Sequence, residues 1–415
     1  MKILILTQYF PPEVGAPQNR LYELAVRLKK HGHQVIVLTA MPNYPKMVIH
    51  KEYKGIWSIK EDMDGLEVHR SCIYVPNSKG LVKRMLNYYS FVVSSLIYGL
   101  FTFGKQDVLM VESPPLFLGK TAWVLSLAKG AKMIFNVSDL WPESAEKLGL
   151  VNNKFFLWLA YKLEHFLYRK SWMVTGQTQG IVHDIKKRFP DKEVYWLPNG
   201  VDVSFFSIEK NNRSDFRLKM GFSTDDFIVL YAGIIGHAQG LEVILKSAEI
   251  LRAHHKVKFV LLGSGPEKEF LLNIKRERKL DHVYFLDPVS KAEMPEIVFS
   301  SNAAIIPLRK LDIFKGAIPS KIFENLAMKK PILLGVEGEA KELFIDEGNA
   351  GLFFEPENEN SLSDAILTLS EDPLLCKKLG ENGRAYVAAK FERNRIAEKF
   401  NEHLVNFFKK SERLD

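Results

Sequence analysis

The sequence predicts an α/β protein made of two Rossmann-like, doubly wound domains that face each other across a cleft. Short apolar runs alternate with helical patterns along the chain, which is typical of βαβ units. This alternation stops at a polar stretch near the middle of the chain and then starts again. The length of 415 residues also suits two to three domains of roughly 150 residues each.

The N-terminal domain is expected over residues 1–195. It opens with the apolar run 2–7 (KILILT), which is typical of a strand buried on both faces. Apolar residues at helical spacing follow over 21–28, before His31-Gly32 ends the helix, and the second apolar strand lies at 34–39. Further strands are expected at 66–69, 107–111, 132–136 and 172–175.

The C-terminal domain is expected over residues 200–393. The boundary is placed after a strand at 193–203 that contains Pro198-Asn199-Gly200, and before the unpatterned stretch 209–215. An amphipathic helix at 394–415 is expected to pack back on the N-terminal domain. Strands are then expected at 227–232, 257–262, 283–286, 303–306 and 331–334, with helices at 241–254, 320–328 and 361–369.

Composition places the chain among ordinary globular proteins, since 47% of its residues are hydrophobic and 26% are charged. Cys72 and Cys376 are the two cysteines, which excludes a zinc-cysteine site and a disulfide framework. The apolar run at 3–6 is shorter than the core of a secretion signal, so a cytoplasmic protein is expected.

The positive charge is concentrated in the first half of the chain. Residues 1–200 carry 26 Lys and Arg against 16 Asp and Glu, whereas residues 201–415 carry 31 against 33. An anionic partner of the N-terminal half is therefore expected, with lysines scattered over a large surface as the alternative.

The stretch 315–334 (KGAIPSKIFENLAMKKPILL) carries the clearest chemical signal. Ser320 is a suitable helix N-cap, which puts Lys321 and Glu324 in the first turn of a helix, where anions are attracted. Lys321 suits a diphosphate, and the Glu324 carboxylate can accept hydrogen bonds from a ribose diol. The alternative is that Glu324 is an acid favoured at a helix N-terminus.

Together with LPNGVDVSFF (197–206), YAGIIGHAQGLE (231–242) and LLGSGPEKEF (261–270), this stretch resembles the family-4 retaining glycosyltransferases of the GT-B fold. The order and spacing of the motifs are similar over nearly the whole chain. In the first half, MPNYPKMVIHKEYKG and VSDLWPES (137–144) resemble the colanic-acid and fucosamine-transferase branch, which builds lipid-linked repeats of surface polysaccharides such as O-antigen and capsule.

The resemblance implies that Glu324 is the second glutamate of the family's Glu-x7-Glu motif and contacts the nucleotide ribose. The first glutamate is replaced by Gly316, and the family's phosphate-binding Arg and Lys fall on Ile234 and Gln239. Phosphate charge is therefore expected to be met by Lys321 and Arg309. The expected donor-binding residues are Gly233, Gly236, Gln239, Gly240, Arg309, Gly316, Ala317, Ser320, Lys321 and Glu324.

Asp139 is expected to act in catalysis together with Lys321 and Glu324. It follows an apolar strand, so it lies at the carboxyl end of a parallel sheet, where ligands of such sheets bind. The alternative is an N-cap for a helix that begins near Trp141-Pro142. The expected residues on the acceptor side are Gly15, Arg20, Lys83 and Arg84.

No metal and no cofactor are expected. The Asp62-Met63-Asp64 sequence has the form of a metal-binding DxD, but its polar setting before Gly65 is typical of a hairpin turn. The sequence Gly263-Ser264-Gly265-Pro266 is not a dinucleotide fingerprint, because Lys268 stands at the place of the third glycine.

Residues 85–104 form a stretch of 20 residues without a charge, flanked by Lys83-Arg84 and Lys105. Its polar and Tyr content is unusual for a membrane-spanning helix. We expect an amphipathic helix that enters the cytoplasmic leaflet beside the basic residues, with a buried core helix as the alternative.

The resemblance thus implies a metal-independent, retaining hexosyltransferase at the inner face of the cell membrane. It would transfer an N-acetylated amino sugar or a deoxy sugar from a UDP-sugar to a lipid-diphosphate-linked saccharide, and it would bind an anionic membrane surface but no nucleic acid. A GT-B nucleotide-sugar epimerase and a non-catalytic donor-binding scaffold are the alternatives.

Overall fold

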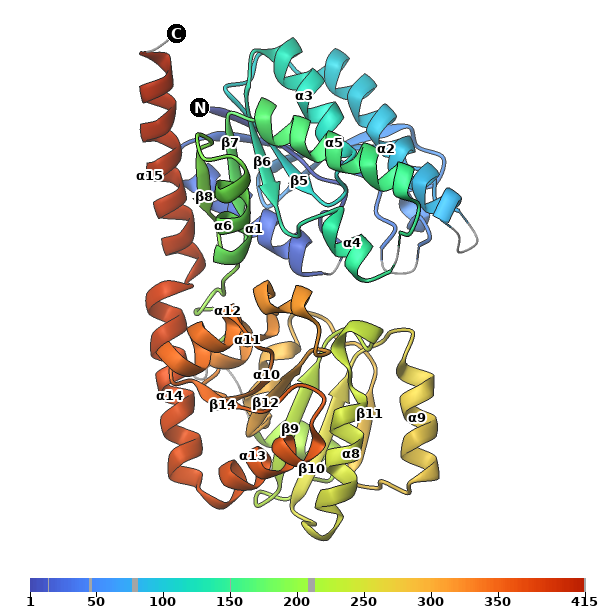
Figure 1. The fold of residues 1–415 in the computed structure, drawn as a ribbon, viewed down its shortest axis with the longest axis vertical. Coiled ribbons are helices and arrows are strands. Elements are labelled where there is room, and N and C mark those ends of the chain that lie inside the picture. Colours follow the sequence, from blue (N-terminus) through green and yellow to red (C-terminus); the bar gives the residue numbers. More distant parts are fainter. Residues whose placement is uncertain (14, 45–46, 77–80, 150, 208–212, 414–415) are drawn as a thin grey trace. The chain divides into compact units, whose positions relative to one another are not determined.

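The computed structural model describes residues 1–13, 15–44, 47–76, 81–149, 151–207 and 213–413. These form two compact units, which are coloured along the chain in Figure 1. Unit 1 contains residues 1–199 and 393–415, and unit 2 contains residues 200–392. Each unit has one mainly parallel sheet with helices around it, which confirms the predicted fold class.

The sheet of unit 1 has eight strands in the order β3-β4-β2-β1-β5-β6-β7-β8. All neighbours are parallel except β3 and β4, which form an antiparallel hairpin. The chain order reverses beside β1, and such a switch point is where ligands bind in open α/β sheets. The strands are β1 (Lys2–Leu6), β2 (Gln34–Ala40), β3 (Ser58–Met63), β4 (Leu66–Ser71), β5 (Val108–Ser113), β6 (Lys132–Val137), β7 (Met173–Gly176) and β8 (Val194–Trp196).

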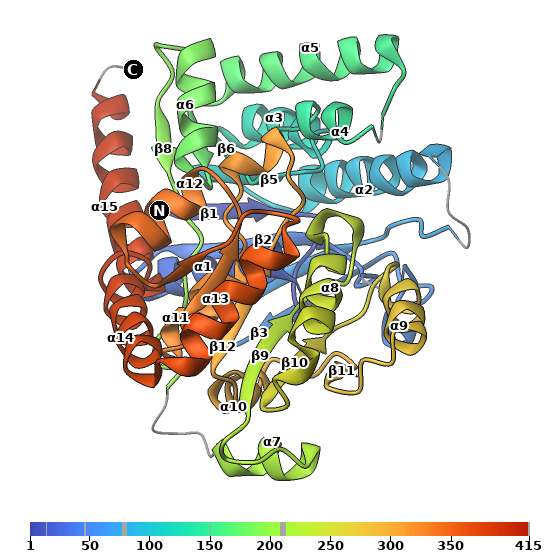
Figure 2. The same ribbon diagram turned by 60° about the horizontal axis from the view of Figure 1, so that its bottom comes forward.

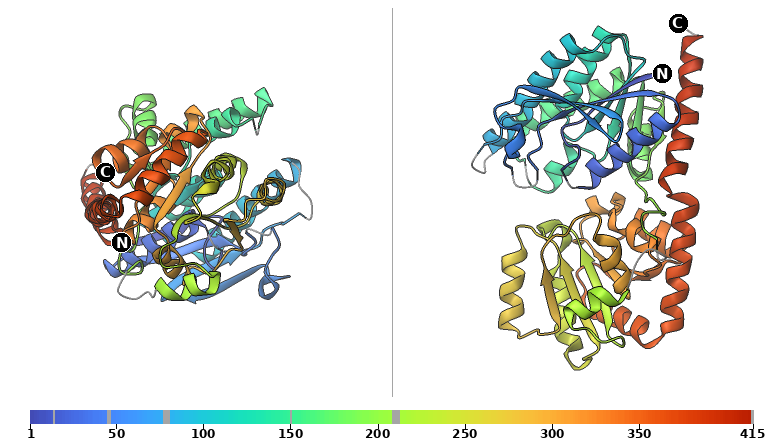
Figure 3. Two further views of the ribbon diagram at one scale, coloured as in Figure 1. Left: turned by 90° about the horizontal axis from the view of Figure 1, so that it is seen from below. Right: turned by 180° about the vertical axis from the view of Figure 1, so that it is seen from behind.

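Helices cover both faces of this sheet. One face packs on α1 and α15 (Figure 3), and the other packs on α2, α3, α5 and α6. Helix α3 contacts both α2 and α5 and lies between them (Figure 2). The helices are α1 (Ala16–Lys30), α2 (Leu81–Thr102), α3 (Leu118–Lys129), α4 (Glu143–Lys147), α5 (Lys154–Lys170), α6 (Gln179–Arg188) and α15 (Arg393–Glu412).

The C-terminal helix α15 belongs to unit 1 although unit 2 precedes it in the chain. Its apolar side, with Phe400 and Leu404, is buried against the face that also holds α1. Polar contacts reinforce this packing, because Arg27 Nε donates to the Asn394 side chain at 2.8 Å and Arg393 pairs with Glu23 at 3.2 Å.

Unit 2 has six parallel strands in the order β11-β10-β9-β12-β13-β14. Helices α8, α9 and α13 pack on one face, and α11 packs beside α14. The strands are β9 (Phe227–Ala232), β10 (Val257–Leu262), β11 (Val283–Leu286), β12 (Ala303–Pro307), β13 (Ile332–Gly335) and β14 (Gly351–Phe353). The helices are α7 (Arg213–Met220), α8 (Glu242–Ile250), α9 (Lys268–Glu277), α10 (Met294–Ser300), α11 (Lys321–Ala327), α12 (Glu339–Lys341), α13 (Glu359–Glu371) and α14 (Pro373–Lys390).

Two elements are shorter than their sequence patterns predict. The strand expected over 193–203 is reduced to β8, because Pro198 has no N–H group to donate to a neighbouring strand. The helix expected over 241–254 ends as α8 at Ile250 and continues only as a 3-10 turn over Leu251–Ala253.

The Asp62-Met63-Asp64 sequence lies at the β3–β4 hairpin, as its composition predicts. Asp64 and Gly65 have φ values of 52° and 78°, and Asp62 Oδ1 accepts a hydrogen bond from Gly65 N at 2.9 Å. Asp64 also accepts a hydrogen bond from the Tyr22 hydroxyl. These carboxylates therefore shape the turn.

Candidate functional site

In unit 2, a half-buried cation, Lys321, lies beside the loop that follows β9. The Lys321 ammonium nitrogen lies 3.9 Å from the centre of the Tyr231 ring. Burial lowers the pKa of Lys321 to about 7, and the negative charge of Glu324 opposes this shift. A desolvated cation of this kind is stabilised when an anion binds beside it.

Gly233, the first residue after β9, makes room for this ammonium group. A Cβ atom at Gly233 would lie 2.9 Å from Lys321 Nζ, and the residue has a φ of 149°, which disfavours any side chain. Gly233 is therefore required for the close approach of the lysine to the backbone of the loop.

Two further glycines explain the Gly263-Ser264-Gly265 sequence after β10. Cβ atoms at Gly263 and Gly265 would lie 1.8 Å and 2.1 Å from the carbonyl oxygens of Gly233 and Ile235. The two loops therefore pack backbone against backbone, which fixes the loop at residues 233–235 beside Lys321.

A second cation, Arg309, lies at the other end of the same loop. Arg309 N donates to Ala238 O at 3.0 Å, and a Cβ atom at Gly240 would lie 3.2 Å from Arg309 Cγ. Arg309 Nε is buried and has no hydrogen-bond partner among the residues that the structure describes. Buried donors without a hydrogen-bond partner are rare in folded proteins, and a ligand bound beside Arg309 would supply the acceptor.

The remaining glycine-loop residues are placed between these cations. The Gln239 side chain folds back on its own loop, since its Oε1 would lie 3.1 Å from a Cβ atom at Gly236. Gly240 has a φ of 58° in the left-handed region, where glycine is favoured. We call residues 233–240 together with Arg309 and Lys321 the cation loop.

Helix α11 begins at Lys321 and carries Glu324 in its first turn, as predicted. The expected capping by Ser320 is wrong, because its side chain makes no cap hydrogen bond. Its φ and ψ of −58° and −28° are helical, whereas a capping residue is usually extended.

Gly316 ends a 3-10 turn at Asp312–Gly316, and Ala317 follows it. A Cβ atom at Gly316 would meet no atom of the described residues within 4 Å. Packing therefore does not require a glycine at this position.

In unit 1, Asp139 lies just beyond the carboxyl end of β6. Ser144 Oγ donates to Asp139 Oδ2 at 2.8 Å. Although the residue is exposed, the surrounding protein desolvates its carboxyl group and raises the pKa of Asp139, while the Ser144 hydroxyl lowers it in part. The nearby helix α4 starts at Glu143 after Pro142 and has no side-chain cap, so Asp139 is not its N-cap.

A buried polar network stands behind Asp139. Arg20, which is 8% exposed, pairs with Glu112 at 2.6 Å and donates to Ser138 Oγ at 2.6 Å and to Gln177 at 2.8 Å. Ser138 and Asn136 both donate to Glu112. Arg20 is thus neutralised by Glu112, which argues against its expected role as a cation toward the acceptor and assigns it to positioning.

The other expected acceptor-side residues are separate from this network. Gly15 precedes α1 and contacts Gln18, whose Oε1 is buried without a partner among the described residues. Lys83 is exposed on α2. The side chain of Arg84 lies outside the described part of the chain.

Sequence reasoning missed Tyr231, Glu112 and Ser138. Tyr231 has the appearance of an ordinary strand residue, and only the fold brings it under Lys321. Glu112 gives a signal that could have been used, because it is an acid at the end of an otherwise apolar strand. Such a residue needs a buried partner.

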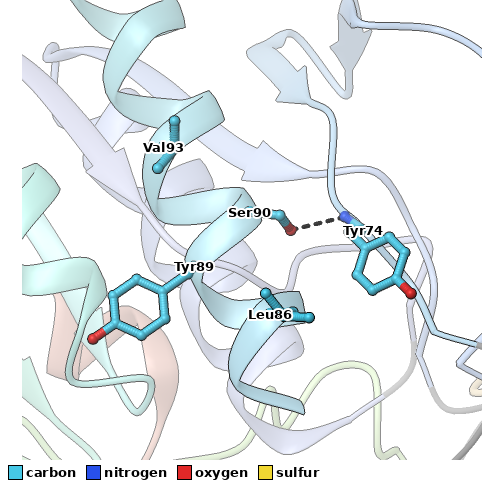
Figure 4. Close-up of a pocket in the computed structure, with 5 residues that line it drawn as sticks. All are labelled: Tyr74, Leu86, Tyr89, Ser90 and Val93. Atoms are coloured by element: carbon cyan, nitrogen blue, oxygen red, sulfur yellow. Dashed lines mark hydrogen bonds between the residues drawn. The ribbon is translucent and has the colours of Figure 1, made fainter. Parts of the chain in front are cut away.

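Helix α2 is buried on one side and exposed on the other. Phe91, Val92 and Ser95 are buried against the sheet, so one side is a core helix. The opposite side exposes apolar side chains, some of which line an open apolar hollow with Tyr74 (Figure 4). Among the described residues, no helix is both long and apolar enough to cross a bilayer.

Comparison with known families gives two matches that follow each other along the chain. Residues 18–205 match the Glycosyltransferase Family 4 model, and residues 212–386 match the model of Glycosyl transferases group 1. Together these ranges cover the strands and loops that carry both candidate sites.

Similar proteins match over nearly the whole length. The colanic acid biosynthesis glycosyl transferase WcaI of Escherichia coli (strain K12) is 24% identical, over 96% of this chain and 98% of the relative. The structure of sucrose-phosphate synthase from Thermosynechococcus elongatus has a TM-score of 0.77 at 17% identity and covers 98% of this chain and 99% of the other. The structure of Anabaena Alr3699/HepE with UDP-glucose has a TM-score of 0.72 at 16% identity and covers 98% and 100%.

Proposed function

The chain is a GT-B glycosyltransferase of glycan or polysaccharide biosynthesis, and on this basis we propose that it transfers a sugar from a UDP-sugar to a lipid-diphosphate-linked saccharide. The observation that supports donor binding is the cation loop, where Lys321 and Arg309 flank residues 233–240. Its two cations match the charge of a diphosphate. UDP-glucose in the structure of HepE, a protein of the same fold, supports uridine as the base.

The reaction would proceed with retention of configuration. The bond between the anomeric carbon and the diphosphate oxygen breaks, and a bond from the anomeric carbon to the acceptor oxygen forms. Lys321 and Arg309 would stabilise the negative charge that develops on the leaving diphosphate. The Asp139 carboxylate, helped by a phosphate oxygen on the same face of the sugar, would take the acceptor proton.

Unit 1 would bind the acceptor. Asp139, at the carboxyl end of β6, would orient the acceptor hydroxyl or a sugar hydroxyl through its carboxylate. The raised pKa of this carboxyl suits proton exchange near neutral pH better than an ordinary aspartate would. The exposed apolar side of α2 would hold the enzyme at the cytoplasmic face of the membrane, where lipid-linked saccharides lie.

One experiment tests this function. The protein is incubated with UDP-sugars that carry N-acetylated amino or deoxy sugars, with and without a lipid-diphosphate saccharide. We expect UDP release that depends on the lipid acceptor. Epimerisation of the donor without acceptor would identify an epimerase instead, and donor binding without either reaction would identify a scaffold.

Glu324 should contact the donor ribose, because it lies in the first turn of α11 next to Lys321. We expect Glu324→Ala to weaken UDP binding by roughly 1.5–3 kcal/mol, the range for hydrogen bonds to a charged group. The measurement is calorimetry with UDP and with 2′-deoxy-UDP. The loss should be much smaller for 2′-deoxy-UDP, and an equal loss for both nucleotides would place Glu324 away from the ribose.

Transfer should persist in excess EDTA, since Lys321 and Arg309 supply the positive charge at the diphosphate. The assay compares initial rates with EDTA and after addition of Mg²⁺ or Mn²⁺. Activity that is lost in EDTA and restored by either ion would show that a metal meets the diphosphate instead.

A further inference from the structure

Exposed apolar side chains form a line along α2. Leu86, Val93 and Ile97 are exposed by 53%, 53% and 42%, and Phe101 is exposed by 87%. Their spacing of three to four residues, or multiples of it, keeps them on one side of a helix, opposite the buried side that packs on the sheet. Tyr89 lies on the same side as Leu86 and Val93, and these three residues line the hollow in Figure 4.

Helix α5 presents a second exposed apolar group at its N-terminal end. Phe155, Trp158 and Leu159 are exposed by 69%, 50% and 46%. The rings of Phe155 and Trp158 stack with their centres 5.9 Å apart, and Lys162 Nζ lies 3.8 Å from the centre of the Trp158 ring. These aromatic side chains are therefore held in place without being buried.

The two helices that carry these groups lie on the same face of the sheet of unit 1. The ring of Phe117, just before α3, contacts both Tyr89 of α2 and Phe156 of α5, at centre distances of 5.0 Å and 6.1 Å. Figure 2 shows α2 and α5 running along the same side with α3 between them. We call the set of Leu86, Tyr89, Val93, Phe155, Trp158 and Leu159 the two-helix apolar face.

The charges around this face are basic. Helix α2 contains no Asp or Glu. The one acid of α5, Glu164, is buried and paired with Arg188 at 2.8 Å. Lys83, Lys154 and Lys162 are exposed on the two helices.

The nearest acids of α4 are engaged elsewhere. Glu143 pairs with Lys147 at 2.5 Å, and Glu146 accepts a hydrogen bond from Tyr161 at 2.6 Å. An apolar face with exposed lysines on both of its helices fits an anionic partner.

We propose that the two-helix apolar face docks on an anionic lipid bilayer, with α5 as a second contact beside α2. Trp and Tyr side chains prefer the boundary between lipid headgroups and acyl chains, and Trp158 and Tyr89 offer such rings from the two helices. Lys83, Lys154 and Lys162 would lie at the level of the lipid phosphates. This inference deepens the proposed function, since it rests on an acceptor that is embedded in a membrane.

The test uses the full chain and vesicles of phosphatidylcholine with 30–40% phosphatidylglycerol, roughly the anionic charge that attracts basic segments. Two variants are compared with wild type in sedimentation at low salt: Leu86→Ser with Val93→Ser on α2, and Phe155→Ser with Trp158→Ser on α5. The matched control is Phe270→Ser with Leu374→Ser, which removes two exposed apolar residues from unit 2. We expect each face variant to lose at least tenfold in vesicle partitioning, whereas the control partitions like wild type.

Melting temperature shows whether unit 1 of the face variants is folded, and UDP affinity shows that unit 2, which holds the proposed UDP site, is unchanged. Wild-type partitioning of a folded α5 variant would overturn the proposal. A dimer of the wild type that both face variants dissociate in analytical ultracentrifugation would also overturn it, in favour of a second copy of the chain. Transfer to a detergent-solubilised acceptor separates the outcomes, because it fails if the proposed function is wrong and persists if only the docking surface is wrong.

Discussion

Replacing Lys321 by methionine should weaken donor binding strongly and at the same time make the protein more stable. The ammonium group lies over the Tyr231 ring, and desolvation lowers its pKa from 10.5 to about 7. Each pKa unit corresponds to about 1.4 kcal/mol, so the folded chain without donor carries a cost on the order of a few kcal/mol at neutral pH. Methionine has a similar shape and removes this cost.

The sign of the pH dependence follows from the same shift. Between pH 7 and the unfolded pKa of 10.5, the unfolded chain binds more protons at this lysine than the folded chain does. The stability of the wild type should therefore rise with pH in this window, and this contribution should be absent in Lys321→Met. Donor affinity should change in the opposite direction, because a diphosphate binds the protonated lysine and binding above pH 7 requires proton uptake.

The measurements are calorimetry with UDP and thermal unfolding between pH 6 and pH 9. We expect UDP affinity to fall by roughly 10- to 100-fold in Lys321→Met, the value of one or two charge-assisted hydrogen bonds. Lys256→Met is the control, since Lys256 is exposed before β10, at the opposite end of the strands. A Lys321→Met protein that binds UDP like wild type would remove the cation loop from the donor site.

The sequence patterns predict the fold class because each βαβ unit is determined by residues that are close together in the sequence. The apolar run 2–7 becomes β1, and the amphipathic pattern 394–410 lies within α15, since burial periodicity needs only neighbouring residues. The expected boundary at 195–200 and the division of the units after Asn199 come from a local breaker sequence. The ends of helices and strands depend on which backbone groups form hydrogen bonds with other parts of the fold. β8 ends early because Pro198 has no N–H group to donate to a neighbouring strand.

The candidate sites depend on contacts that the sequence does not display. Lys321 and Tyr231 are 90 residues apart, and Arg20 and Glu112 are 92 apart, yet each pair meets at the carboxyl ends of parallel strands. The position of Asp139 is predicted from the end of a strand, that of Lys321 from a helix N-terminus, and that of Arg309 from the family resemblance. Only the three-dimensional structure shows that Arg20 pairs with a buried carboxylate. A basic residue on a helix has the same local sequence pattern whether it is free or paired.

The Asp139→Asn variant should reduce transfer at least a hundredfold while leaving the fold intact. The carboxyl group accepts a hydrogen bond from Ser144 at 2.8 Å, and an asparagine oxygen can accept the same bond. The variant side chain cannot act as a general base, because the asparagine amide does not take up a proton. A group acting as a general base contributes about 10²–10⁴ in rate.

The buried network of Arg20, Glu112 and Ser138 should keep the local structure the same in the wild type and in Asp139→Asn. Ser138, the preceding residue, is held by Arg20 at 2.6 Å and by Glu112, so the backbone that carries residue 139 is fixed by groups that the substitution leaves unchanged. The introduced asparagine should therefore occupy the place of the aspartate. The assay compares kcat and KM for transfer, with melting temperature and UDP affinity as checks on unit 1 and unit 2.

A loss confined to kcat, with the melting temperature and UDP affinity of the wild type, is the result expected for a carboxylate that acts on the acceptor hydroxyl. Raising the pH should not restore the variant, since no titratable group remains at the position. Near-normal turnover in Asp139→Asn would limit the carboxylate to its hydrogen bond with Ser144, and deprotonation would then rest on the donor phosphate alone.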